Sequence, residues 1–268
     1  MSATRAGCWL VRPDGVRLQV HGLDGDPGLA PVVLGHGAGS RPAFVHACFA
    51  GALADCGLRA VTYDARGHGQ STPVTAPGLL GLDAHAGDLG AVVALAGARL
   101  AGGISLGAHA AAWWAAGAGA GHLDGLLLAA PGWLGPPGVV AAANAAQADE
   151  LERVGLPAVL DRLAGEPLGW LGTELAAWWP AHRPAAFAAV LRALAAAPAP
   201  GAAELARLVV PVGVAGLADD PMHPSGAAQA WADALPRGRY AETSLSAMAT
   251  DRGALGAAAV RAWLAAGS

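Results

Sequence analysis

The chain contains no lysine, because all sixteen of its basic residues are arginine. Mechanisms that use a lysine amine, as a Schiff base or as a general base, are therefore excluded. Charged residues make up only 13% of the 268 residues, about half the share of an average soluble domain. The net charge is −4 and the arginines form no cluster, which argues against nucleic-acid binding.

Long apolar runs are also missing, although 54% of the residues are hydrophobic. Much of that share is alanine, and Gly, Pro, Asp or Arg interrupts every run before the roughly 18 residues that a membrane-spanning helix needs. Met1–Arg5 lead into further charged residues without the apolar core of a signal peptide. We therefore expect a cytoplasmic protein without a membrane partner.

Cysteine is scarce, and Cys8, Cys48 and Cys56 form no CxxC pair. An odd count in an intracellular chain argues for buried thiols. Cys48 falls in a predicted helix and Cys56 just past its end, where packing is the expected role. We assign no metal ligands and no cofactor.

Short apolar strands alternate with alanine-rich helices along most of the chain. This alternation predicts a mostly parallel sheet with helices on both faces, preceded by a hairpin at the Pro13-Asp14-Gly15 turn. The expected strands are 8–12, 16–21, 31–34, 58–64, 100–104, 123–130, 208–216 and 239–245. The expected helices are 42–54, 83–96, 106–118, 225–234 and 253–266.

The pattern changes between residues 133 and 205, where proline repeatedly breaks the helical segments and no strand is indicated. This change predicts a helical cap over 133–205, inserted into a core formed by 1–132 and 206–268. Four of the nine tryptophans lie in the cap segment: Trp133, Trp170, Trp178 and Trp179. We expect the last three to pack the cap against the core, with contact to a hydrophobic ligand as the alternative.

One motif indicates chemistry: Gly103-x-Ser105-x-Gly107 follows an apolar strand and opens a helix. Glycines two residues before and after the serine let neighbouring backbone approach a strained turn. The helix N-terminus that follows favours a developing negative charge. This context predicts a nucleophile elbow with Ser105 at its tip. An ordinary turn with a helix-capping serine is the alternative.

Two further segments make the chain resemble the α/β-hydrolase family: His-Gly-Ala-Gly at 36–39 and Asp-Ala-Arg-Gly-His-Gly at 64–69, each after an apolar strand. The resemblance implies an eight-stranded, mostly parallel sheet flanked by helices. It also implies that the Ala38 and Leu106 amides form an oxyanion hole. In this family His36 and the turn that contains His68 are expected to be structural.

The segment Gly-Leu-Ala-Asp-Asp-Pro-Met-His-Pro at 216–224 resembles the family loop that carries the acid of the catalytic triad. Asp220 fits the spacing to Pro224, and we favour it as the acid. Asp219 fits a second spacing of the family. Both aspartates could instead cap the helix that follows.

The family pattern breaks at the base, because no histidine follows His223 and the family expects one after the last strand. Without an imidazole Ser105 keeps its proton and is a poor nucleophile. Among the replacements His223 is best placed, although lying three residues from Asp220 constrains its reach. Asp251 would be a weak base, since the neighbouring Arg252 favours its charged form.

We expect the other candidate histidines to take no part in the chemistry. His109, one turn past the serine, should pack beneath it. His85 should lie on a surface helix. His182 should face solvent on the cap, with a position facing a ligand as the alternative.

Two hypotheses follow. The first is a serine hydrolase that acts on a small hydrophobic ester, lactone or thioester through Ser105 and Asp220, with an incomplete triad whose base is unassigned. The second is a non-hydrolytic enzyme of this fold, which performs cyclisation, isomerisation or elimination, or a catalytically silent ligand-binding protein. The missing terminal histidine motivates the second.

Overall fold

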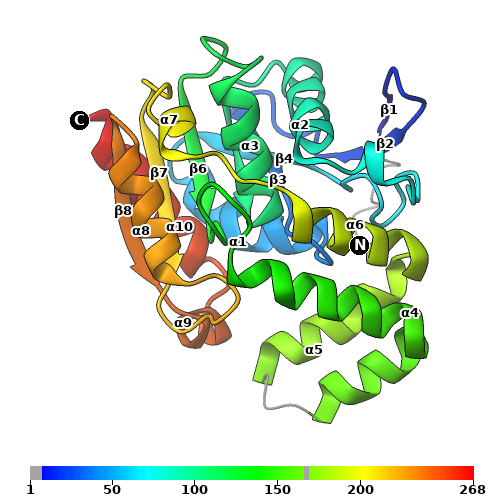
Figure 1. Cartoon of the computed structure of the whole chain (residues 1–268). Helices are drawn as coiled ribbons and strands as arrows, with labels where there is room; N and C mark the ends of the chain where they lie inside the picture. The colour runs from blue at the N-terminus through cyan, green and yellow to red at the C-terminus, as the bar shows by residue number, and fades with distance from the viewer. Residues whose placement is uncertain (1–7, 166–168) are drawn as a thin grey trace.

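The computed structural model describes residues 8–165 and 169–268. Met1–Arg5, where we expect no secretory signal, lie outside the described residues. An eight-stranded sheet runs through the molecule in the order β1-β2-β4-β3-β5-β6-β7-β8 (Figure 1). The strands are β1 (Cys8–Val11), β2 (Arg17–His21), β3 (Ala30–Gly35), β4 (Leu58–Tyr63), β5 (Leu100–Ile104), β6 (Gly125–Ala129), β7 (Val212–Leu217) and β8 (Gly238–Thr243).

The sheet is parallel from β4 to β8, whereas β2 runs antiparallel to both of its neighbours. The predicted hairpin and the predicted mostly parallel eight-stranded sheet are confirmed. β3 and β5 are adjacent, with Gly35 opposite Gly103 at their carboxyl ends. The loop after β3 and the turn after β5 therefore leave the sheet side by side.

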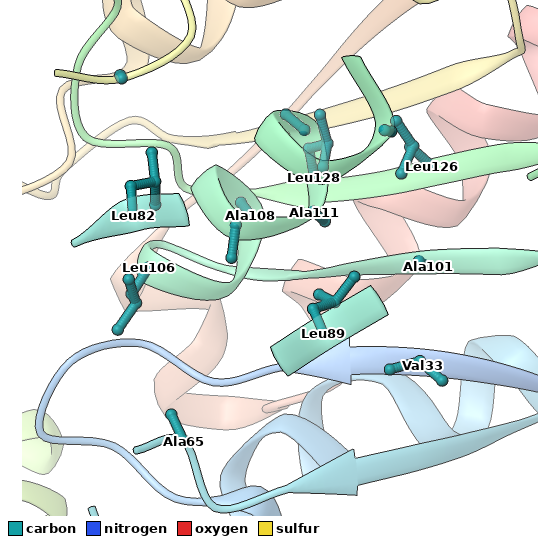
Figure 2. Close-up of a cluster of buried hydrophobic side chains, with 14 of the residues drawn as sticks. Val33, Ala65, Leu82, Leu89, Ala101, Leu106, Ala108, Ala111, Leu126 and Leu128 are labelled. Atoms are coloured by element: carbon teal, nitrogen blue, oxygen red, sulfur yellow. The ribbon is translucent and has the colours of Figure 1, made fainter. Parts of the chain in front are cut away.

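Helices cover both faces of the sheet. One face packs against α2 (Leu82–Ala96), α3 (Leu106–Ala116) and α8 (Ser225–Ala234). The other face packs against α1 (Pro42–Ala54), α10 (Ala254–Gly267) and the short α9 (Leu245–Thr250). Figure 2 shows the first layer, where Leu89 from α2 and Ala108 and Ala111 from α3 lie over Val33 and Leu128 of the strands. Burial on both faces explains why the central strands β5, β6 and β7 are apolar throughout instead of alternating.

Small residues bring the helices of the second layer close together. A Cβ on Gly256 of α10 would lie only 2.1 Å from the Cys48 carbonyl oxygen on α1. Cys48 is buried at this contact, and burial raises the pKa of its thiol to about 12. All three cysteines are free, and the packing role predicted for Cys48 is confirmed. The expectation of buried thiols is wrong for Cys8, which lies exposed on the edge strand β1.

Between β6 and β7 the described chain forms helices only, without a strand (Figure 1). These helices are α4 (Val139–Gly165), α5 (Gly169–Trp178), η2 (Trp179–Ala181), α6 (Pro184–Ala196) and α7 (Ala202–Leu205). α4 is two helical segments joined at Gly155, which has non-helical dihedrals (φ 79°, ψ 164°). Trp178, Trp179 and Phe187 belong to the separate hydrophobic cluster that α4 and α6 share.

One stretch, Pro77–Ala96, is long and apolar enough to span a membrane by length and composition alone. It comprises the turn η1 (Pro77–Leu79) and the core helix α2. Half of its most apolar window is buried inside the fold, and the fully buried Asp88 on α2 bonds to the Arg66 guanidinium. Packing in the core therefore accounts for its apolar character.

Candidate active site

Ser105 occupies the sharp turn between β5 and α3. Its backbone has φ 51° and ψ −112°, a conformation that costs a residue with a side chain roughly 1–3 kcal/mol. The Ser105 amide donates to the Ala129 carbonyl at 2.9 Å, and the Ser105 carbonyl accepts from the His109 amide at 2.9 Å. The strained strand-to-helix turn expected at this serine is therefore present.

Three glycines explain how this turn is accommodated. A Cβ on Gly107 would lie 2.1 Å from the Gly35 carbonyl oxygen, and a Cβ on Gly103 would lie 2.3 Å from the same atom. Cβ atoms do not approach backbone so closely, so β3, β5 and the start of α3 can meet only where side chains are absent. The glycine spacing around Ser105 is a consequence of this three-way contact.

An imidazole lies at the serine. His223 Nε2 is 2.9 Å from Ser105 Oγ, and His223 Nδ1 is 2.8 Å from Asp220 Oδ2. The expectation of an incomplete triad is therefore wrong in its geometry. The imidazole comes from the loop after β7, which also carries the aspartate, rather than from the segment after β8 where the family pattern expects it.

The loop reaches this geometry by turning around its own aspartate. Asp220 Oδ1 accepts hydrogen bonds from the amides of Met222 at 2.8 Å and His223 at 3.2 Å, which leaves Oδ2 for the ring. The turn folds the imidazole back over the carboxylate, so a separation of three residues does not limit its reach. Burial alone would raise the pKa of the Asp220 carboxyl, but the His223 ring and the two amides hold it below its ordinary value.

Asp219 points to a different partner. Its carboxylate accepts from the amides of Leu245 at 2.5 Å and Ser246 at 3.1 Å, and from the Ser246 hydroxyl at 2.7 Å. The hydrogen bond from the Ser246 side chain is the main reason that its pKa is lowered. Asp219 thus fastens the loop after β7 to the first turn of α9. The structure brings Asp220, not Asp219, to the imidazole.

Ala38 and Leu106, from which we expect the oxyanion hole, line the same cavity as Ser105. The loop after β3 passes close to the serine, since a Cβ on Gly37 would lie 3.4 Å from the Ser105 Cβ. Within the described residues, neither the Ala38 amide nor the Leu106 amide donates a hydrogen bond. Both N–H groups are therefore available to an oxygen atom of a ligand.

Behind this loop, neutral histidines serve as hydrogen-bond acceptors. His36 Nε2 accepts from the Ala65 amide at 2.9 Å, and His68 Nε2 accepts from the Gly39 amide at 3.0 Å. Burial lowers the pKa of His36 to about 4 and that of His68 well below its ordinary value. Both rings connect the loop after β3 to the turn after β4, which agrees with the structural roles expected for them.

Two of the other histidine predictions are wrong. His182 is buried rather than solvated, because its Nδ1 accepts from the Gly69 amide at 3.1 Å and its ring packs on His68. His85 is buried rather than on the surface, since it shares a face of α2 with Asp88, whose carboxylate pairs with Arg66 in the core.

The prediction for His109 is confirmed. Its ring is fully buried, accepts from the Gly132 amide at 3.1 Å and stacks on Trp133 with ring centroids 4.2 Å apart. Burial lowers its pKa to about 3. His109 supports the segment after β6 from below and makes no bond to the serine hydroxyl.

A cavity of about 520 Å³ opens over Ser105 between the sheet and the inserted helices. Its wall is mostly apolar, and six aromatic side chains contribute to it: Phe44, Trp133, Trp170, Trp178, Trp179 and Phe187. Trp178 and Trp179 are also packed in the cluster of the inserted helices, so the same side chains form part of the helix packing and part of the cavity wall. In the part of the chain that the structure describes, no three His, Cys, Asp or Glu side chains gather to hold a metal ion.

The eight-stranded sheet, the serine at a strained turn and the adjacent imidazole and carboxylate define an enzyme of the α/β-hydrolase fold. Residues 27–164, just over half of the chain, match the family described as serine aminopeptidase, S33. The chain belongs to this family of α/β-hydrolases. A search of curated proteins found no match.

Solved structures agree with this assignment. A hydrolase from Pseudomonas aeruginosa PA01 is 22% identical, with a TM-score of 0.71 over 98% of this chain and 99% of that one. A thermophilic esterase from Thermogutta terrifontis is 20% identical, with a TM-score of 0.71 over 89% of each chain. An enol-lactonase from Burkholderia xenovorans LB400 is 19% identical, with a TM-score of 0.69 over 88% of this chain and 91% of that one. At these identities the likeness establishes the fold.

Proposed function

We propose that the chain is a serine hydrolase that acts on a small hydrophobic ester, lactone or thioester, with Ser105 as nucleophile. The observation that carries this proposal is the continuous hydrogen-bonded line from Ser105 Oγ through His223 to Asp220. A serine becomes an effective nucleophile when an adjacent imidazole takes its proton and a third group orients that imidazole.

Each residue has a separate role in the proposed reaction. His223 Nε2 accepts the hydroxyl proton as Ser105 Oγ attacks the carbonyl, and it returns that proton to the departing alcohol or thiol. Asp220 holds the ring by Nδ1 and stabilises the imidazolium that forms. The Ala38 and Leu106 amides donate to the oxyanion. A water molecule, deprotonated by the same imidazole, then releases the acid from the acyl-enzyme.

The cavity supports an uncharged ester in preference to a peptide with a free amino terminus. An ammonium group would require an available carboxylate, and among the described residues the carboxylates that line the cavity are Asp220 and Glu150. Asp220 is bonded to His223, and Glu150 is paired with Arg162. The rest of the wall is largely aliphatic and aromatic, which suits an apolar acyl or alkyl group.

The non-hydrolytic and ligand-binding alternatives rested on the lack of an imidazole near the serine. His223 removes that reason, and no specific feature of the described residues favours either alternative. We further propose a cytoplasmic location without nucleic-acid or membrane partners, on the sequence evidence given above.

A fluorophosphonate probe tests the proposal together with hydrolysis of p-nitrophenyl esters. We expect labelling of the wild-type protein at Ser105 and none of Ser105→Ala. His223→Gln should lower kcat by about 10⁶-fold, as loss of a triad base does. His122→Gln, which changes an exposed histidine, is the matched control and should keep full activity. If the folded wild-type protein shows neither labelling nor turnover, the proposed function is wrong.

A further inference from the structure

One wall of the cavity is formed by the first half of α4, which starts beside the imidazole. A Cβ on Gly132 would lie 3.6 Å from Val140 Cγ2 and 3.8 Å from His223 Cδ2. The first turn of α4 and the His223 ring therefore lie next to each other at Gly132. From this point the helix runs along the cavity, and residues spaced three or four apart share the face that lines it.

Two carboxamides, Asn144 and Gln147, lie on this face beyond Val140, and both line the cavity. At 1.5 Å of rise per residue they lie about 6 Å and about 10 Å further along the helix axis than Val140. Asn144 is only 8% exposed. Neither carboxamide makes a hydrogen bond to any residue that the structure describes.

No described residue bonds to the Asn144 carboxamide, yet its polar atoms are not among the buried side-chain atoms that lack a partner, so they face the cavity and not the packed interior. Leucine has nearly the shape of asparagine and would suit a wall that contacts only apolar groups. The walls of ligand cavities commonly place a few polar groups among apolar ones in order to orient a ligand. The position of Asn144 on the cavity wall fits this second situation.

The charges on the same wall indicate that the ligand group that would bond to Asn144 is neutral. Glu150 follows Gln147 on α4, and its carboxylate accepts from Arg162 at 2.7 and 2.8 Å. Within this pair the charges compensate each other. A carboxamide both donates and accepts hydrogen bonds, so a hydroxyl or a carbonyl satisfies it equally well.

We propose that Asn144, assisted by Gln147, is a specificity-determining residue that hydrogen-bonds a second, uncharged polar group of the substrate. The substrate class is then an apolar ester, lactone or thioester that carries a hydroxyl or keto group at a distance from the scissile carbonyl. This inference rests on the proposed function, because it assumes that the scissile carbonyl lies at Ser105.

Binding to the Ser105→Ala protein tests the inference without turnover. The ligands are matched pairs of alkyl esters, one plain and one with a terminal hydroxyl, with increasing chain length on the acyl side or on the alcohol side. Tryptophan fluorescence reports binding, since four tryptophans line the cavity. For each pair the measured quantity is the ratio of the two dissociation constants.

We expect that, at one chain length, Asn144→Leu weakens binding of the hydroxylated ester by about tenfold relative to the plain ester. This is the effect of losing one hydrogen bond to the Asn144 carboxamide. Gln147→Met should shift the ratio less. Gln229→Met makes the same chemical change on the exposed face of α8 and should leave the ratio unchanged. An unchanged ratio in Asn144→Leu at every chain length, or no binding of either ester, overturns the inference. If the proposed function were wrong instead, the esters would still bind but Ser105 in the wild-type protein would stay unlabelled.

Discussion

The two halves of the proposed active site are built in different ways. The nucleophile half is held by close backbone contacts, with Gly35, Gly103 and Gly107 pressed together beneath Ser105. The acid–base half is a partly exposed loop after β7, shaped by hydrogen bonds to one carboxylate, Asp220. The backbone beneath Ser105 leaves no space for side chains at its glycines. The shape of the loop after β7, in contrast, depends on hydrogen bonds within a few residues.

The histidines show the same contrast. On the nucleophile side, His36, His68 and His109 are fully buried and act as neutral acceptors for backbone amides. On the loop, the side chain of His223 is 24% exposed and bonded between a hydroxyl and a carboxylate. An imidazole that must exchange protons needs access to the reacting groups, while one that supports a loop must be kept from protonation. The same side chain therefore serves two purposes in one site.

The sharpest test of the acid–base half compares the two adjacent aspartates. Asp220→Asn should lower kcat by about 10⁴-fold, because the carboxylate that fixes the tautomer and stabilises the imidazolium is lost. Asp219→Asn should change kcat by less than about threefold and should destabilise the fold by about 1 kcal/mol, as loss of a helix cap does. Ester hydrolysis and urea unfolding of both variants provide the measurements. A strong rate effect at Asp219 with a weak one at Asp220 would reverse the assignment.

The nucleophile half predicts a loss of stability in acid. Burial lowers the pKa of His36 to about 4 and the pKa values of His85 and His109 to about 3 in the folded protein. In the unfolded chain the same side chains bind a proton below about pH 6.5. The stability they contribute is complete above about pH 6.5 and is lost as the pH falls toward the folded pKa values. At about pH 5 each of these histidines lowers the free energy of unfolding by about 2 kcal/mol relative to neutral pH.

Urea unfolding in buffers of stepped pH measures this effect. His85→Gln removes one titrating group and should flatten the profile by that group's share, whatever it does to the absolute stability. A free energy of unfolding that stays constant between about pH 7 and pH 5 would show that these imidazoles are not held neutral.

The last test concerns the close backbone contact. Gly107→Ala places a methyl group where the Gly35 carbonyl oxygen is 2.1 Å away, so it should destabilise the fold by about 1–3 kcal/mol and displace the serine. Gly51→Ala, in helix α1 with open space around the position, should stabilise by about 0.5–1 kcal/mol. Thermal unfolding distinguishes the two variants. Equal behaviour of both would mean that the contact beneath Ser105 is not tight.

Most of the fold could be predicted because the strands and helices follow from local patterns. The errors lie at element ends, where tertiary contacts decide. β7 starts at Val212 rather than at residue 208, after Pro211, which has no N–H to give to a neighbouring strand. The strand predicted to end at 245 stops at Thr243, since Ser244 caps the unpredicted helix α9 through its hydroxyl.

The position of the base could not be predicted in the same way. The family pattern directed attention to the segment after β8, and the short spacing from Asp220 argued against His223. The signal that was present is the run Asp-Pro-Met-His-Pro at 220–224, which begins with an aspartate able to bend the chain around its own side chain and continues with two prolines. Whether the bent loop faces Ser105 depends on the sheet order β5-β6-β7, which a local pattern does not contain.

The shared loop also affects how this enzyme can change over evolution or in the laboratory. The proposed base and the carboxylate that orients it are encoded within a few codons, so a single segment exchange could transplant or erase the pair in a scaffold that already has the elbow. The sequence from β8 onward then supplies neither group. Its Leu245 and Met248 line the cavity, so this segment can change the shape of the cavity without altering the pair.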